Sequence, residues 1–440
     1  MKKESSTRNF LVMVSMIFAL FFGAGNLIFP LHLGQMAGHN WAQAAFGFCL
    51  TGVLLPLLAL FGLARTHAHS MYEAFLPLGP KPALMLLVLL QLTIGTIMGT
   101  PRTATVSYTV GIAPLLPHHL QQMGLLAFTA LYFVTCFAVT YSESTFLNQV
   151  GKILNPLCLL LLFTVFFLAF KNPLGGLNHA AHAVYLRHAL TGGFLEGYNT
   201  GDALGALAFG VAIINAIKSL HFKKTAETLA TAGSTAMALI ALIYVLLIML
   251  GTMSLGRFRL SENGGVALSQ VVRAYGGHVG QALLAALIIT TCITTGMGLV
   301  SAFALDFHRH FPRLSYHGWL AVVCVISFWV ATTGLDRIIS WSRPLLNFLY
   351  PVAITIIILA VLSPYFAHDK IVYRVTVAFV LIPALLDLLA TIPVNWAWVH
   401  FFSQVRGLLP LAQVGLSWLI PGGIGLVIGW LYHLQKVRRA

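Results

Sequence analysis

Residues 16–30 read Met16-Ile-Phe-Ala-Leu-Phe-Phe-Gly-Ala-Gly-Asn-Leu-Ile-Phe-Pro30, a stretch hydrophobic enough to span a bilayer although Gly23, Gly25, Asn26 and Pro30 lie near its centre. Residues of these types interrupt helices, which leaves backbone N–H and C=O groups without partners. In lipid such groups are tolerated only where they are buried in protein or line a cavity. The stretch therefore predicts a broken membrane helix at which something polar binds, as in many secondary transporters.

A second segment of the same character follows about 175 residues later. It reads Gly197-Tyr-Asn-Thr-Gly-Asp-Ala-Leu-Gly-Ala-Leu-Ala-Phe-Gly210 and adds a carboxylate, Asp202. Two interrupted hydrophobic segments in corresponding halves of a chain indicate an inverted-repeat carrier.

The composition is that of an all-α integral membrane protein. Of the 440 residues, 58% are hydrophobic and only 8% are charged, and the mean hydropathy is +0.88. A soluble domain would be about a quarter charged. The net charge of +14 does not indicate a nucleic-acid partner, because the basic residues lie between hydrophobic runs, where they set the orientation of the spans. The five cysteines lie in apolar runs without metal-ligand spacing, which is typical of small buried hydrophobic residues.

The hydrophobic segments number about twelve, and short connections hold most of the Lys and Arg. If the N-terminus is cytoplasmic, sixteen basic residues fall on the cytoplasmic side and eight on the opposite side. This bias predicts that both termini are cytoplasmic. We expect one membrane transport domain over residues 1–440, with no linker and no soluble domain.

Four stretches of the chain resemble a known family, the bacterial branched-chain amino acid:cation symporters of the BrnQ type. The most specific is Thr100-Pro-Arg-Thr-Ala-Thr-Val-Ser-Tyr-Thr-Val-Gly-Ile-Ala-Pro114. The others are residues 18–30, residues 197–210 and Cys292-Ile-Thr-Thr-Gly-Met-Gly-Leu299. One departure is Thr109, where relatives often carry an acidic residue, so a coupling role that depends on that carboxylate does not transfer to this chain.

The resemblance implies uptake of leucine, isoleucine and valine across the bacterial inner membrane, usually driven by sodium. It implies no cofactor and no obligate protein partner beyond the membrane lipid. The implied fold is similar to that of the broken-helix leucine transporter, with discontinuous helices 1 and 6. Spans one to five (about residues 8–170) would form the first repeat, spans six to ten (about 192–364) would form the inverted second repeat, and two additional helices would follow (about 371–435).

The two broken segments supply candidate groups for an amino acid. Backbone N–H groups around Gly23, Ala24, Gly25 and Asn26 would lie at a half-helix N-terminus, where the helix dipole favours the substrate carboxylate. The alternative is that these glycines only permit close helix packing. Asp202 is the strongest single candidate, because an ionisable residue within a span is costly. It could accept the substrate ammonium, help to hold a cation, or cap the second half of the helix.

Further substrate contacts are expected from polar and aromatic residues near these segments. The candidates are Ser107, Tyr108, Tyr198, Asn199 and Phe209, although an aromatic residue in a span most often serves packing. Arg102 is expected to pair with a carboxylate or a helix end, or to reach an interface. Asp387 is expected to serve packing or assembly rather than transport.

The segment Thr290-Thr-Cys-Ile-Thr-Thr-Gly-Met-Gly298 is rich in hydroxyl groups, which are ligands that sodium accepts. Thr291 and Thr295 share one helix face. By similarity to the broken-helix fold, Thr294 and Thr295 could hold sodium together with carbonyl groups near Gly23 and Ala24. The alternative is that each threonine bonds the carbonyl group three or four residues before it.

Other function classes are less consistent with the sequence. It contains no Gly-x-Ser-x-Gly, His-Glu-x-x-His or Walker motif of a membrane-embedded enzyme, and no filter-like repeated loop of a channel. Within the transporters, proton coupling through Asp202 and another neutral amino acid as substrate remain open alternatives.

Overall fold

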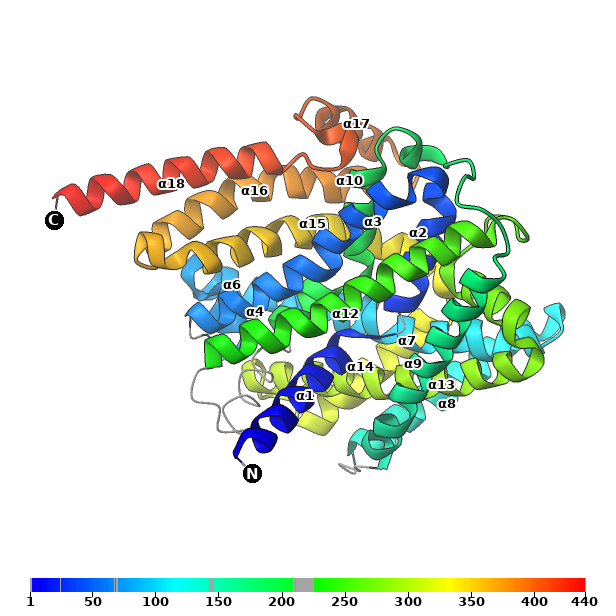
Figure 1. Ribbon diagram of the computed structural model, residues 1–440. Coiled ribbons are helices and arrows are strands. Elements are labelled where there is room, and N and C mark those ends of the chain that lie inside the picture. Colours follow the sequence, from blue (N-terminus) through cyan, green and yellow to red (C-terminus); the bar gives the residue numbers. More distant parts are fainter. Residues whose placement is uncertain are drawn as a thin grey trace.

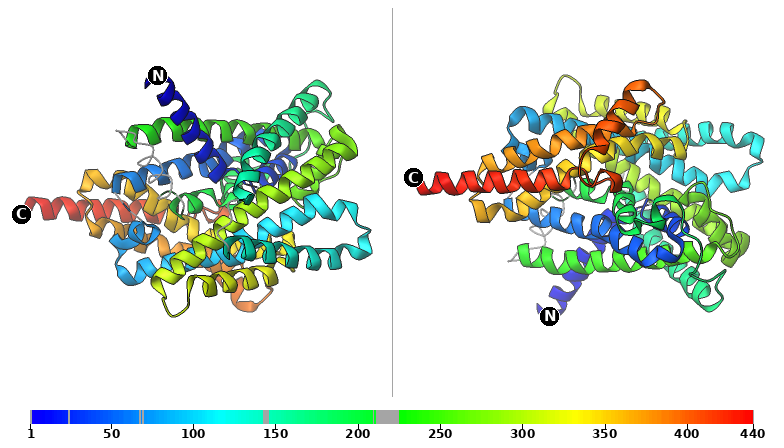
Figure 2. Two further views of the ribbon diagram at one scale, coloured as in Figure 1. Left: turned by 90° about the horizontal axis from the view of Figure 1, so that it is seen from below. Right: turned by 90° about the horizontal axis from the view of Figure 1, so that it is seen from above.

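The fold is helical throughout the part of the chain that the structure describes. The computed structural model describes residues 2–23, 25–66, 68, 70–141, 146–208, 210 and 225–439, and these ranges contain helices but no strand. Long helices lie side by side, and the C-terminal helix α18 reaches beyond the others at one end (Figures 1 and 2).

The α-helices carry the labels of Figure 1. In chain order they are α1 (Lys2–Phe21), α2 (Gly25–Ala37), α3 (Trp41–Cys49), α4 (Leu55–Thr66), α5 (Met71–Phe75), α6 (Pro80–Gln91), α7 (Gly99–Ser107), α8 (Gln121–Tyr141), α9 (Phe146–Lys171), α10 (Ala189–Glu196), α12 (Thr225–Ser254), α13 (Gly264–His310), α14 (Tyr316–Ala331), α15 (Leu335–Leu362), α16 (Lys370–Thr391), α17 (Ala397–Gly407) and α18 (Leu419–Arg439). The π-helical segments η2 (Leu50–Leu54), η4 (Leu92–Ile97) and η5 (Tyr108–Ile112) join or extend these helices, and the 3-10 helix η9 (Gly197–Thr200) follows α10.

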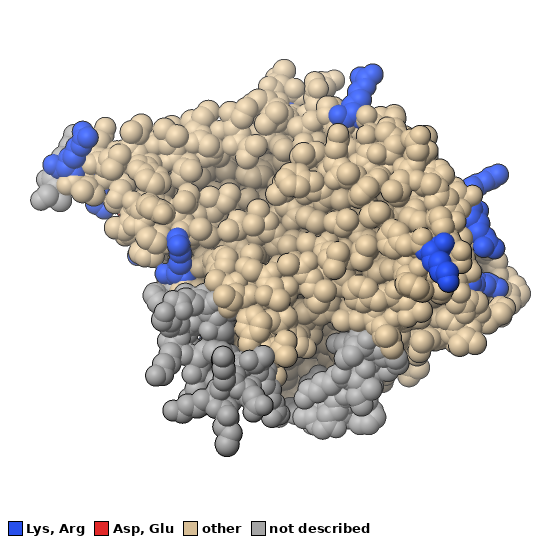
Figure 3. Space-filling model, in the orientation of Figure 1, with Lys and Arg blue, Asp and Glu red and all other residues tan. Residues whose placement is uncertain are grey.

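Many of these helices are apolar and long enough to cross a membrane. Among the described residues, seven stretches meet that condition, and three shorter apolar helices accompany them. On the face that Figure 3 shows, Lys and Arg lie mainly towards the two ends, and a broad uncharged surface separates them. The prediction of an integral membrane protein agrees with this structure, whereas the count of twelve spans and the inverted repeat stay predictions.

Both predicted helix interruptions occur where glycine and polar residues enter an apolar segment. The first separates α1 from α2 at residues 22–24, of which Ala24 lies outside the described residues. The second separates η9 from a further helical stretch at residues 202–208, with Gly201 between them. Gly201 has a φ of 77°, a left-handed conformation that residues with a Cβ adopt at a cost.

Two pairs of glycines let helices approach closely. A Cβ on Gly34 of α2 would lie 1.9 Å from the carbonyl oxygen of Ile248, and one on Gly251 of α12 would lie 1.9 Å from that of Leu31. In the same way, a Cβ on Gly47 of α3 would meet the Leu190 carbonyl of α10 at 1.9 Å, and one on Gly193 of α10 would meet the Ala44 carbonyl of α3 at 2.0 Å. Small residues at such crossings are how membrane helices gain close packing. The crossings fix α12 against α2 and α3 against α10.

Candidate functional site

The two helix interruptions meet at a hydrogen bond between Asn26 and Asp202. The Asn26 Nδ2 donates to Asp202 Oδ2 at 2.7 Å, and the two side chains are only 3% and 7% exposed. Asn26 stands at the start of α2, and Asp202 begins the helical stretch that follows Gly201. The sequence-predicted residues of the two segments are therefore adjacent in the fold.

Asn26 also orders its own interruption. Its Oδ1 accepts from the backbone N–H of Gly23 at 3.0 Å, and its own backbone N–H donates to the Gly23 carbonyl at 3.1 Å. One side chain thus bonds the broken backbone with its oxygen and the opposite segment with its nitrogen. This explains why an asparagine, rather than another glycine, follows Gly25.

The second interruption is ordered chiefly by Thr200. Its hydroxyl donates to the Gly197 carbonyl at 2.9 Å and accepts from the backbone N–H of Asp202 at 3.3 Å. The helix resumes with a hydrogen bond from the Gly205 N–H to the Gly201 carbonyl at 2.8 Å. Since Thr200 provides the local side-chain contact, the Asp202 carboxylate is directed to side chains of other helices.

Tyr244 of α12 completes a buried triad with Asn26 and Asp202. Its hydroxyl donates to Asp202 Oδ2 at 2.8 Å, accepts from Asn26 Nδ2, and is fully buried. The ring lies edge-on to Phe48, with 5.0 Å between the ring centroids. Sequence reasoning missed this residue, because a tyrosine inside an apolar run has no local signal that separates a hydrogen-bonding role from packing.

Arg102 lies between the two interruptions. Its Nη1 donates to the Asn199 carbonyl and its Nη2 to the Thr200 carbonyl at 3.1 Å, so the guanidinium bonds the carboxyl end of η9. Its charge lies over the Phe29 ring, 5.1 Å from the centroid. One of the roles expected for Arg102 was an interaction with a helix end. The structure has Arg102 at the carboxyl end of η9, where a positive charge is favourable.

Gly25 leaves room for this guanidinium. A Cβ at Gly25 would lie 3.2 Å from Arg102 Nη2 and 3.4 Å from the Phe29 ring. Since Arg102 also interacts electrostatically with Asp202, the site holds one fixed positive charge and one carboxylate between the broken helices.

Tyr198 and Asn199 lie beside this arrangement. The Tyr198 ring stacks on Tyr350 of α15, with 4.1 Å between the centroids and 7° between the planes. Both tyrosine hydroxyls are buried without a hydrogen-bond partner in the described part of the chain. Asn199 is buried and contributes its carbonyl to Arg102.

The hydroxyl-rich segment of α13 is adjacent to the first interruption. A Cβ on Gly23 would lie 4.0 Å from the Thr295 hydroxyl oxygen, so the structure brings these two predicted sodium ligands together. The hydroxyls of Thr294 and Thr295 each donate to the Thr291 carbonyl at 2.9 Å, which is the back-bonding alternative. The described residues contain no cluster of three or more His, Cys, Asp or Glu that could hold a metal ion.

Ser107 and Tyr108 are bonded elsewhere. The Ser107 hydroxyl donates to the Thr103 carbonyl at 2.8 Å, and the Tyr108 hydroxyl donates to the Gln121 carbonyl at the start of α8. Neither side chain bonds to Asn26, Asp202 or Tyr244. The predicted residues Ala24 and Phe209 lie outside the described residues.

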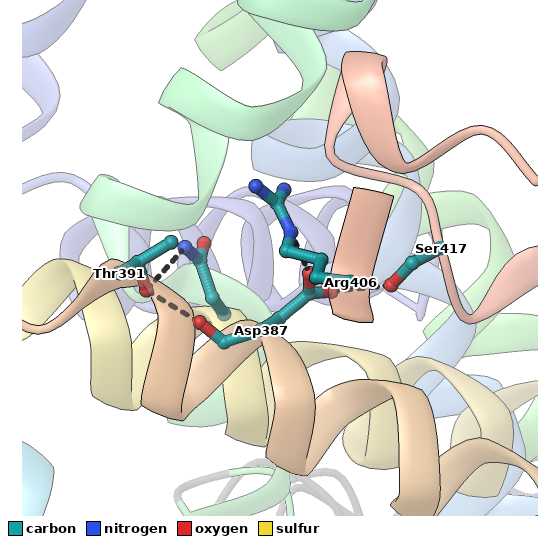
Figure 4. Close-up of polar contacts among 5 residues, drawn as sticks. Asp387, Thr391, Arg406 and Ser417 are labelled. Atoms are coloured by element: carbon teal, nitrogen blue, oxygen red, sulfur yellow. Dashed lines mark hydrogen bonds and ion pairs between the residues drawn. The ribbon is translucent and has the colours of Figure 1, made fainter. Parts of the chain in front are cut away.

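Asp387 joins the C-terminal helices to one another (Figure 4). Its Oδ1 forms an ion pair with Arg406 of α17, and its Oδ2 accepts from the Ser417 hydroxyl at 2.6 Å, next to α18. Thr391 donates to the Asp387 carbonyl at 2.6 Å and accepts from Asn347 of α15 at 3.4 Å. These contacts agree with the expected packing role for this carboxylate.

Comparison with known proteins points to one family. Residues 6–436 match the family described as branched-chain amino acid transport protein. The chain is 36% identical to the branched-chain amino acid permease BrnQ of Lactobacillus delbrueckii subsp. lactis over 428 residues, which cover 96% of each chain. It is 34% identical to BrnQ of Bacillus subtilis over the full length of both chains. It is 35% identical to BraB of the same organism, over 99% of this chain and 97% of that relative.

Proposed function

Because the chain belongs to the branched-chain amino acid transport protein family, and its relatives are permeases rather than enzymes, we propose that it takes up leucine, isoleucine and valine by sodium symport. In this proposal transport follows alternating access, and the substrate binds between the interrupted helices. The observation that carries it is the buried contact between Asn26 and Asp202, which joins both interruptions at one place.

The proposed site has a separate binding group for each of the two charges of an amino acid. The N-terminal end of α2, with the backbone around Gly23, Ala24, Gly25 and Asn26, would receive the carboxylate, because the helix dipole favours an anion there. The N–H groups of Gly23 and Asn26 would exchange their present hydrogen bonds for bonds to it. Asp202 would receive the ammonium, since a buried carboxylate is the strongest acceptor available in such a site.

The remaining candidates would form the walls of the site. Tyr198 and Asn199 are buried next to Arg102, and Tyr198 would offer its unpaired hydroxyl. Phe209 would line the side-chain pocket. Ser107 and Tyr108 would become contacts only in a state in which their present hydrogen bonds are exchanged.

Sodium would lie between the first interruption and α13. Its proposed ligands are the hydroxyls of Thr294 and Thr295, the neighbouring Thr291, and carbonyl groups of Gly23 and Ala24. The position of Thr295 beside Gly23 supports this arrangement. Oxygen ligands without net charge suit a hard monovalent cation.

The two helix interruptions, one in each half of the chain, support an inverted repeat. We propose a first repeat of about residues 8–170, a second of about 192–364 and two additional helices at about 371–435, in a fold like that of the broken-helix leucine transporter. The protein would lie in the bacterial inner membrane with both termini in the cytoplasm.

Uptake of radiolabelled leucine into proteoliposomes tests the proposal. Three conditions are compared: an inward sodium gradient, an inward proton gradient, and no gradient. We expect accumulation only with sodium, inhibited by excess isoleucine and valine. Accumulation with protons alone would replace sodium coupling by proton coupling through Asp202, and no accumulation by inserted, folded protein would overturn the proposed transport.

Two threonine variants test the proposed sodium site. Thr295→Ala removes one proposed ligand and should raise the sodium concentration for half-maximal uptake by roughly five-fold, which corresponds to about 1 kcal/mol. Thr290→Ala is the matched control, because Thr290 makes the same type of back-bond, to Ala286 at 2.8 Å. Equal sodium dependence of the two variants would exclude Thr295 as a ligand.

A further inference from the structure

A wholly apolar groove runs between α8 and α14. It has a volume of about 400 Å³, and its lining includes Phe133, Val134 and Phe137 on α8 and Cys324, Val325 and Phe328 on α14. Phe133 and Cys324 form its buried floor, while Val134 and Val325 are exposed along its sides. In the candidate span that contains α8, only 22% of an apolar 18-residue stretch is buried within the protein, so most of this stretch faces outward.

An aromatic pair lies one helical turn beyond the groove. Tyr141 follows Phe137 on α8, and His317 precedes Ala321 of the groove lining on α14. Their rings are 4.2 Å apart between centroids, and both side chains are exposed. Tyrosine at the end of an apolar span is typical of the headgroup level of a membrane. The groove thus leads from the hydrocarbon level to an interfacial end.

The connection next to this end is basic. It carries His308, Arg309 and His310 at the end of α13 and Arg313 just before α14. Arg313 is exposed and forms no ion pair among the described residues. The nearby acid Asp306 accepts a hydrogen bond from Gln91 of α6. The Nδ1 atoms of His308 and His310 contact the carbonyls of Leu314 and Asp306, so a phosphate group at this position would meet the Arg313 guanidinium and the His317 imidazole.

We propose that this groove is a binding site for one acyl chain of an anionic phospholipid, with the lipid phosphate at His317 and Arg313. The apolar lining supplies affinity for the chain, and the basic end supplies the preference for a negatively charged headgroup. Basic pockets beside membrane helices bind anionic lipids in this way. The site is separate from Asn26 and Asp202 and does not depend on the proposed transport mechanism.

Native mass spectrometry of the purified full-length protein tests the site. The two probes are phosphatidylglycerol and phosphatidylcholine with identical acyl chains. Wild-type protein should retain phosphatidylglycerol about five-fold more than phosphatidylcholine, because one basic residue near a membrane surface contributes about that factor. Equal retention of the two lipids would overturn the proposal.

Two variants separate the groove from its basic end. Val134→Trp fills the groove from an exposed position and should reduce retention of both lipids, whereas Val427→Trp on α18 is the matched control with similar exposure (65% and 58%). Arg313→Gln should abolish the preference for phosphatidylglycerol, and Arg337→Gln, another exposed arginine, should preserve it. If Val134→Trp retains as much lipid as Val427→Trp, or if Arg313→Gln keeps the preference, the proposed site is wrong.

Discussion

The Asn26 side-chain amide donates to the Asp202 carboxylate at 2.7 Å, which connects two helix interruptions 176 positions apart in the chain. Tyr244 donates to the same carboxylate oxygen at 2.8 Å. A buried carboxylate with two such donors is stable in an apolar interior because its hydrogen bonds replace those of water. Any movement of one broken helix against the other must break or rearrange this contact.

Replacement of Asp202 by Asn should reduce leucine uptake by roughly ten-fold or more. The amide oxygen can still accept from Asn26 and Tyr244, so the fold should persist, but the negative charge for the substrate ammonium is lost. A hydrogen bond to a charged group contributes about 1.5–3 kcal/mol, which sets this scale. Uptake is measured in proteoliposomes and normalised to folded protein.

Asp306→Asn is the control for the Asp202 variant. Asp306 is also hydrogen-bonded, to Gln91, but it lies outside the proposed site. Its replacement should leave uptake near the wild-type level. Equal uptake by the two variants would exclude a special role of Asp202 in transport.

Two tyrosine variants should have different effects on stability. Tyr244→Phe removes a hydroxyl that bonds Asp202 and Asn26, and should lower the free energy of unfolding by about 1–3 kcal/mol. Tyr350→Phe removes a buried hydroxyl without a partner, so it should be neutral or stabilising. Thermal unfolding of the purified variants measures both. A Tyr350 variant less stable than the Tyr244 variant would contradict the assigned hydrogen bonds.

Arg102→Lys should loosen the second interruption without unfolding the protein. A lysine has one ammonium and cannot match the fork with which Arg102 contacts the Asn199 and Thr200 carbonyls. Hydrogen exchange of a peptide that covers residues 197–208 should become roughly ten-fold faster, since a charge-assisted bond of about 1.5–3 kcal/mol is lost. Arg337→Lys, at an exposed position, should leave this exchange unchanged. Unaltered exchange in the Arg102 variant would show that the guanidinium does not hold the segment.

Both helix interruptions could be predicted from sequence because their signals are local. Gly23, Gly25 and Asn26 are unusual at the centre of an apolar segment, and so are Gly201 and Asp202. Arg102 could also be singled out from sequence, because it is a charged residue in or beside an apolar span. One of its expected partners was a helix end, and the structure has it bonded to the end of η9.

The contacts between the interruptions could not be predicted in the same way. Nothing in the sequence near Tyr244 marks it as a partner of Asp202, because the contact depends on the packing of α12 against α2. The approach of Thr295 to Gly23 likewise follows from tertiary packing. Local chemistry thus identified most of the candidate residues, and the helix packing determined which of them meet.

Acid should weaken the attachment of α18 to α16 through Asp369. This residue lies in the connection before α16, where its carboxylate accepts from the Ile371 N–H at 3.0 Å and contacts His433 Nδ1 at 3.0 Å and Lys436 Nζ at 3.5 Å. Burial alone would raise the pKa of Asp369, but these hydrogen bonds and the Lys436 charge outweigh burial and lower the pKa below its usual value. A depressed pKa means that the carboxylate stabilises the fold above its unfolded-state pKa of about 3.9. That stabilisation is lost as the pH falls through the folded-state pKa.

Asp369→Asn should therefore be less stable than wild type at neutral pH, and the difference should shrink as the pH falls below about 4. Asparagine can still cap α16, so Asp369→Ala should lose a further ~1 kcal/mol at every pH. Melting temperatures of the three proteins between pH 7 and pH 3 measure these effects, with Asp336→Asn as a control carboxylate that bonds Asn263. If the gap between wild type and Asp369→Asn stayed constant over this range, the charge of Asp369 would not be what holds α18 to α16, and neutral packing of the two helices would account for their attachment.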